Sequence, residues 1–193
     1  MTDVIKDGTG KGYLAKVNSN NELAVEGIVE SSFHRNSEKD MGFVIATPIL
    51  AVTATGGRAL RAVPTDLPAH IAGFTIGWNG GNTNHNRMLE VEVYFGEGAP
   101  TANHVALAAR STISGSVRVP AFTTWRWDGV GNGMTGMSAG SLIMSCIVGP
   151  GCTFVPIDGM LAITLASAMS INLKGEEAGN ATFKFTGYSE ELP

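Results

Sequence analysis

Two carboxylates have a spacing that could serve catalysis. Glu90 and Glu92 lie two residues apart in an alternating stretch, so both face the same side of a predicted strand. A glycosidase needs a second carboxylate on the other side of the bond that it cleaves, and the sequence singles out no partner for that role. We therefore interpret the pair as a solvated strand face, and a hydrolase using Glu90 or Glu92 as its acid stays an alternative.

The other chemically suggestive residues do not form complete motifs. The four histidines are isolated in the sequence: His34, His70, His85 and His104. None has a second ligand at the i+2 or i+4 spacing that metal sites often use. The glycines of 8–12 lack the first glycine and the hydroxyl of a phosphate loop, and those of 131–136 lack an enclosing βαβ unit. We predict no catalytic residues, no cofactor, no metal site and no enzymatic activity.

Composition favours association with other proteins. Only 16% of the 193 residues are charged, against about 25% in average soluble chains, and the centres of protein interfaces are depleted of charge. We therefore expect a homo-oligomer, with a trimer as the favoured size. The net charge of −4 and the absence of a Lys/Arg cluster argue against direct binding to nucleic acid, which needs basic side chains to neutralise phosphates.

The sequence also bears on the compartment and on the cysteines. The first residues include Asp3 and Asp7 and no apolar run follows them, so we find no secretory signal. The longest apolar stretch, 43–54, is interrupted by proline and too short to span a bilayer. We expect synthesis in the cytoplasm and no membrane contact. Cys146 and Cys152 are therefore predicted to be free thiols.

The chain divides into an N-terminal arm, residues 1–32, and a body, residues 33–193. In the arm, two short extended runs flank the polar stretch 18–21, which is typical of a β-hairpin. A lone hairpin is at best marginally stable in water. Its apolar side chains, namely Leu14, Val17, Leu23 and Val25, therefore need another surface to pack against.

The body has the pattern of an all-β domain. Apolar residues alternate in 89–95, 161–165 and 182–186, whereas 142–148 is continuously apolar, as expected of a strand buried on both faces. The only candidate helix is 102–110. With about eight strands, the pattern predicts an antiparallel β-sandwich, jelly-roll-like, preceded by the β-hairpin arm.

The three tryptophans lie near predicted turns. Trp78 precedes one turn, while Trp125 and Trp127 precede the glycine-rich stretch 131–136. Tryptophan is enriched at protein interfaces, and its ring can also stack on sugars. We interpret the three as core or subunit-interface residues, and as glycan-stacking platforms in an alternative hypothesis.

Residues 7–23 resemble the N-terminus of a group of tailed-bacteriophage virion proteins. The segment reads Asp-Gly-Thr-Gly-Lys-Gly-Tyr-Leu-Ala-Lys-Val-Asn-Ser-Asn-Asn-Glu-Leu. Proteins of this group begin with an Asp-Gly-Thr-Gly segment, continue through an Ala-Lys-Val strand and turn at an Asn-rich loop. The resemblance implies a non-enzymatic structural component of the virion: a head decoration, head-fibre or neck protein made in the host bacterial cytoplasm. Its partners would be the major capsid protein or the neck and portal proteins.

The resemblance also assigns roles within the arm. Four residues would set the path of its backbone: Gly8, Gly10, Gly12 and Tyr13. Four others would be buried against the particle: Leu14, Val17, Leu23 and Val25. The alternative function is a tail-associated module that binds a receptor or a glycan through Trp78, Trp125 and Trp127.

Overall fold

The computed structural model describes residues 41–80, 87–112 and 120–189, together with the backbone of three short N-terminal strands. The chain divides into two compact units, Met1–Ser31 and Ser32–Pro193. The sequence-based boundary lies after residue 32.

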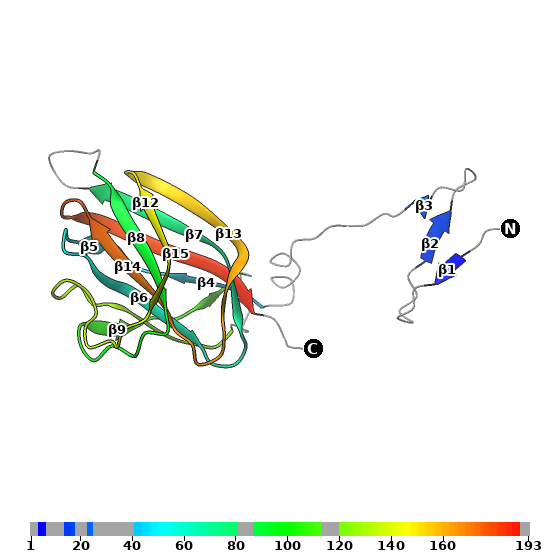
Figure 1. Cartoon of the computed structure of the whole chain (residues 1–193), viewed down its shortest axis with the longest axis horizontal. Helices are drawn as coiled ribbons and strands as arrows, with labels where there is room; N and C mark the ends of the chain where they lie inside the picture. The colour runs from blue at the N-terminus through cyan, green and yellow to red at the C-terminus, as the bar shows by residue number, and fades with distance from the viewer. Residues whose placement is uncertain are drawn as a thin grey trace. The chain divides into compact units, whose positions relative to one another are not determined.

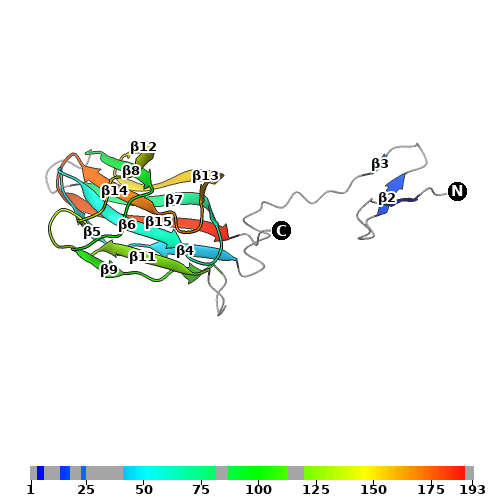
Figure 2. The same ribbon diagram turned by 60° about the horizontal axis from the view of Figure 1, so that its bottom comes forward.

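Two antiparallel sheets form the second unit, packed face to face as a β-sandwich (Figures 1 and 2). The β7 sheet has the order β10 (Arg110–Ser111), β4 (Gly42–Ala46), β15 (Gly179–Ser189), β7 (Ala69–Gly80) and β13 (Gly151–Ile163), and β5 (Leu50–Val52) pairs with β15. The β8 sheet has the order β12 (Ser141–Val148), β8 (Leu89–Phe95), β14 (Met169–Gly175), β6 (Gly57–Pro64), β11 (Phe122–Trp127) and β9 (His104–Ala106).

The order of the eight principal strands is that of a jelly roll. These strands are β4, β6, β7, β8, β12, β13, β14 and β15. Counted along the chain as one to eight, they form one sheet in the order 1-8-3-6 and the other in the order 5-4-7-2. Consecutive strands mostly alternate between the sheets, as in a double Greek key. The predicted all-β, jelly-roll-like sandwich is confirmed.

The core lies between the sheets and follows the alternation read from the sequence. Leu89, Val91 and Val93 of β8 are fully buried, as are Phe183 and Phe185 of β15. Because successive side chains of a strand point to opposite faces, their neighbours face outward. Most of the core consists of aliphatic and phenylalanine side chains, which bury large apolar areas without polar atoms to satisfy.

Three sequence-based expectations for the body are wrong. The continuously apolar stretch 142–148 forms β12, an edge strand with exposed side chains, not one buried on both faces. The predicted helix at 102–110 is absent, and these residues instead include β9 and the start of β10. Leu165 lies beyond the end of β13 and is exposed. In each case tertiary pairing overrides a local pattern of apolar residues.

The N-terminal unit contains a three-stranded antiparallel sheet. β2 (Leu14–Val17) pairs with β3 (Leu23–Ala24) on one side, which is the predicted hairpin, and with β1 (Val4–Lys6) on the other. The third strand adds backbone hydrogen bonds to a hairpin whose two strands alone would be only marginally stable in water.

Candidate interaction surface

The predicted attachment residues fall largely outside the described part of the chain. Leu14 and Val17 lie on β2 and Leu23 on β3, where the backbone alone is described. The remaining five are outside the described residues: Gly8, Gly10, Gly12, Tyr13 and Val25. The structure therefore places the strands of the arm but not its contact side chains.

Two of the three tryptophans belong to the core. Trp78 and Trp127 are 3% and 4% exposed. The Trp78 indole Nε1 donates to the carbonyl oxygen of Arg87 at 2.7 Å, and Trp127 Nε1 donates to that of Val130 at 2.6 Å. A buried ring with a satisfied N–H has no free face for a sugar. The glycan-stacking interpretation of Trp78 and Trp127 is therefore wrong, and the core interpretation describes them.

Trp125 lies half-buried on β11 and is covered by other side chains. The Arg61 guanidinium lies 5.1 Å from the centroid of its ring, within the range of a cation–π contact. The His104 ring meets it edge-on at 6.4 Å. Trp125 and Arg61 are cross-strand neighbours in the register of β11 and β6. Arg61 and His104 thus hold the Trp125 ring in place on the outer surface of the β8 sheet.

The outer face of the β8 sheet carries a network of paired polar groups. Glu92 accepts hydrogen bonds from Tyr94 Oη at 3.1 Å and Asn172 Nδ2 at 2.7 Å. Burial, and then the hydrogen bond to Glu92, raise the pKa of Tyr94 above its usual value. Glu90 lies 3.4 Å from the ammonium group of Lys174. Both carboxylates have partners within the network and neither faces a described pocket.

The strongest charged pair of this face joins β6 to the segment after β8. Arg58 Nη2 and Nε donate to Glu97 Oε1 at 2.6 and 2.8 Å, and Nε also approaches Oε2 at 2.9 Å. Burial lowers the pKa of Arg58, but the hydrogen bonds and charge of Glu97 more than offset it, so that the pKa is raised. Arg61 donates to the Glu97 backbone oxygen, and burial lowers the pKa of Arg61. The pairing holds the 97–101 segment against the sheet.

The sandwich exposes apolar side chains along one edge. β12 is the edge strand of the β8 sheet and β13 the edge strand of the β7 sheet, and residues 149–150 connect them (Figures 1 and 2). We call the exposed set the apolar edge: Leu142, Ile143, Ile147, Phe154 and Met160. Most proteins avoid large exposed apolar patches, and those present commonly mark protein interfaces.

The register shows how the apolar edge extends over both outer faces. Ile147 lies opposite Glu90 of β8, on the outer face of the β8 sheet. Phe154 lies opposite Thr75 of β7, on the outer face of the β7 sheet. Its ring lies over Gly73, where a Cβ would come within 2.7 Å of it. Phe154 therefore has support on one side while remaining 60% exposed.

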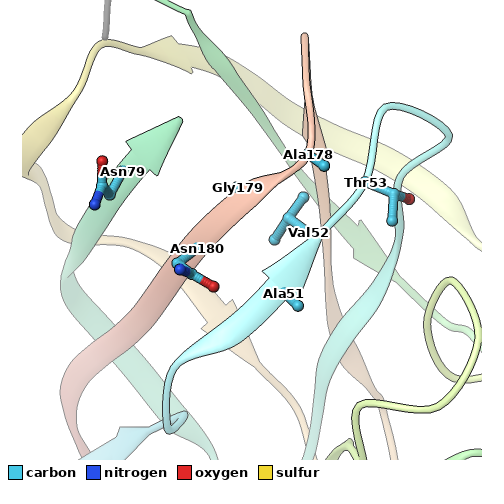
Figure 3. Close-up of a pocket in the computed structure, with 7 residues that line it drawn as sticks. All are labelled: Ala51, Val52, Thr53, Asn79, Ala178, Gly179 and Asn180. Atoms are coloured by element: carbon cyan, nitrogen blue, oxygen red, sulfur yellow. The ribbon is translucent and has the colours of Figure 1, made fainter. Parts of the chain in front are cut away.

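A shallow pocket opens beside β5 and the ends of β7 and β15. Its volume is about 440 Å³. Its described lining consists of Ala51, Val52, Thr53, Asn79, Ala178, Gly179 and Asn180 (Figure 3). These side chains include no ionisable group, so they can offer hydrogen bonds and apolar contact but no acid, base or nucleophile. Among the described residues, no group of three His, Cys, Asp or Glu side chains is placed to bind a metal ion.

Both cysteines are free thiols, as predicted. Cys146 faces the core side of β12 and is half-buried, and burial raises the pKa of its thiol. Cys152 is exposed on β13, two residues before Phe154 and on the same face. The strands of the two cysteines, β12 and β13, belong to different sheets.

No family model, curated protein or solved structure matches this chain. Within the described residues, no helix has the length and apolar character needed to cross a membrane.

Proposed function

We propose that this chain is a non-enzymatic structural component of a tailed-phage virion, of the head-decoration, head-fibre or neck type. It attaches to the particle through its N-terminal unit and self-associates through its β-sandwich. Its partners are other virion proteins, the major capsid protein or the neck and portal proteins.

The observation that carries the structural role is the apolar edge. Ile147 and Met160, 69% and 87% exposed, belong to β12 and β13, in which Asp158 is the single charged residue. An isolated soluble domain gains nothing from such a surface, whereas a subunit buries it on assembly. A jelly roll by itself hosts many functions, so the fold does not distinguish among them.

The phage setting is supported by the N-terminal segment. Residues 7–23 carry the resemblance to virion proteins, and they lie within a unit, Met1–Ser31, that is separate from the sandwich. A small separate sheet with several apolar residues suits an attachment element, because it needs a partner surface to cover its apolar side chains. Many weak contacts of this kind on a symmetric particle would act together through multivalency.

The alternative function, a tail-associated receptor- or glycan-binding module, has less support. Two of its three proposed stacking residues, Trp78 and Trp127, are core residues, and Arg61 lies against the third, Trp125. The hydrolase hypothesis is also weakened, since Glu90 and Glu92 are engaged by Lys174, Tyr94 and Asn172.

Binding of the purified chain to particles that lack it tests the attachment role. The full chain should co-sediment with such particles, and a chain without residues 1–31 should not, because the attachment strands are removed. Circular dichroism of the truncated chain should still show a folded β-sandwich.

The control is Val130→Lys, which changes an exposed side chain in the turn after β11. It should bind as the full chain does. Equal binding of the truncated chain would show that attachment does not use the N-terminal unit. If the full chain itself fails to bind, the virion proposal is wrong.

A further inference from the structure

We infer that the apolar edge, formed by β12 and β13, is the contact surface between copies of this chain. The inference deepens the proposed function, because it names the surface through which the sandwich self-associates. Its parts are Leu142, Ile143 and Ile147 of β12 and Phe154 and Met160 of β13.

First, β12 and the first half of β13 lack most of the protection that natural sheet edges have. Natural edge strands are protected by charged side chains, especially lysine, by proline, by bulges or by a covering segment. None of the eight residues of β12 is charged or proline, and its one register shift lies between Leu142 and Met144, so that 144–148 pairs regularly with β8. β13 has Pro156 and an irregular register between Pro156 and Leu161, but its outward-facing Phe154 precedes that irregularity. A partner is therefore needed to cover the margin.

The second argument concerns charge. Between Asp128 and Lys174 the sequence contains a single ionisable acidic or basic side chain, Asp158. A partner of this surface must itself be uncharged where it makes contact, because an unpaired charge is costly to bury. The same edge of a second copy fits this need, because none of the eight residues of β12 is charged and β13 has Asp158 as its single charged residue. A second copy that meets the first through its own β12 and β13 therefore supplies a nearly uncharged surface.

The contrast with the other sheet supports the same partner. The outer face of the β8 sheet carries Glu90, Glu92 and Lys174, together with the Arg58–Glu97 pair. On this face charge begins at β8, whereas the edge strand β12 beside it has no charged residue. The charged residues are thus paired with one another within the sheet, and the uncharged strand lies at its edge, where a partner can cover it.

The third argument is size. A stable interface uses about 20–30 residues from each partner. Strands of 8 and 13 residues, with the turn that connects them, supply a surface of that order. Self-association also needs no additional component, and symmetric homo-oligomers are the commonest assemblies of soluble chains.

Association of the full chain in solution tests the inference, by light scattering after size-exclusion chromatography. The wild type should have a mass that is a multiple of 20.1 kDa. Ile147→Lys and Phe154→Lys should each raise the dissociation constant by about tenfold or more, because assembly would remove a charged ammonium group from water. Ile147→Lys can fold normally because the new lysine lies opposite Glu90.

The matched control is Val130→Lys, because Val130 is 61% exposed, close to the 60% of Phe154. Val130 follows β11, which lies far from β12 in the strand order of the β8 sheet. This variant should associate as the wild type does. Cys152 gives a second readout, since its alkylation should be slow in the wild-type oligomer and fast in Ile147→Lys.

Three results would overturn the inference. The wild type could be a monomer at tens of micromolar, or Val130→Lys could dissociate as strongly as the edge variants. Alternatively, a chain lacking residues 1–31 could be monomeric while Ile147→Lys stays assembled, which would assign the contact to the N-terminal unit. Particle binding is a separate measurement, so a monomer that still binds particles would refute this inference and the self-association, but not the proposed attachment to a virion.

Discussion

The charged residues on the outer face of the β8 sheet stabilise the fold by pairing with one another. The Glu97 side chain is 3% exposed, and it meets Arg58 through two oxygens while its backbone oxygen accepts from Arg61. Such a bidentate contact between guanidinium and carboxylate is both directional and strong. Its members come from β6 and from the segment after β8, so the pair fixes a loop on a strand.

Glu97→Gln should lower the free energy of unfolding by about 2–4 kcal/mol, because it leaves the Arg58 charge half-buried without its counter-ion. Urea unfolding followed by tryptophan fluorescence measures the change. The control is Glu90→Gln, whose partner Lys174 is 3.4 Å away and exposed, and which should cost less than about 1 kcal/mol. Equal effects of the two substitutions would contradict the role assigned to Glu97.

Cys146 should react slowly with thiol reagents in the folded chain. Burial raises the pKa of its thiol, and the thiolate is the reactive form. At neutral pH we expect alkylation at least about tenfold slower than in urea, as quantified by mass spectrometry of the Cys146 peptide. Reaction at the same rate in both conditions would mean that the inner side of β12 is open to solvent.

At the scale of elements, a close approach fixes the segment that follows β11. A Cβ at Gly57 would overlap the backbone carbonyl of Asn132, and the adjacent Arg58 forms an isolated bridge with Met134. Gly57→Ala must displace this segment and should lower stability by about 1–3 kcal/mol. Gly149→Ala is the control, since its Cβ would meet only the Met88 sulfur at 3.8 Å. Thermal melts of both variants test the difference, and a stable Gly57→Ala would contradict the predicted clash.

The sequence predicts the interior strands well and the edges poorly. β8 and β15 alternate because one face of each is buried against the opposite sheet, and alternation is a local signal that a single sequence contains. β12 is continuously apolar for a different reason: its outward side chains belong to the apolar edge. A local pattern cannot distinguish burial within a chain from burial between chains.

The candidate site is less predictable than the fold. The scarcity of charge between Asp128 and Lys174 is visible in the sequence and indicates an interface, but its location depends on β12 and β13 being edge strands. The Arg58–Glu97 pair joins residues 39 positions apart, and no local spacing predicts it. The sequence alone does not distinguish a core position from an interface position for Trp78 and Trp127, because tryptophan is common at both.

In the whole molecule, we assign a different task to each of the two units. The N-terminal unit attaches and the sandwich associates, so removing residues 1–31 should leave the melting temperature of the sandwich within a few degrees of the full chain, as measured by differential scanning calorimetry. The reason is that the chain divides into two compact units, each held together by its own internal contacts. A large loss of stability would mean that the sandwich depends on the N-terminal segment for its own fold.

The copy number of the chain in purified particles tests whether it is a structural part of a virion. Quantitative mass spectrometry should find it at a fixed ratio to the major capsid protein from one preparation to the next. A ratio near one would indicate decoration of the capsid lattice, and a small ratio a vertex, neck or tail position. Absence of the chain from particles that contain their capsid protein would contradict the account.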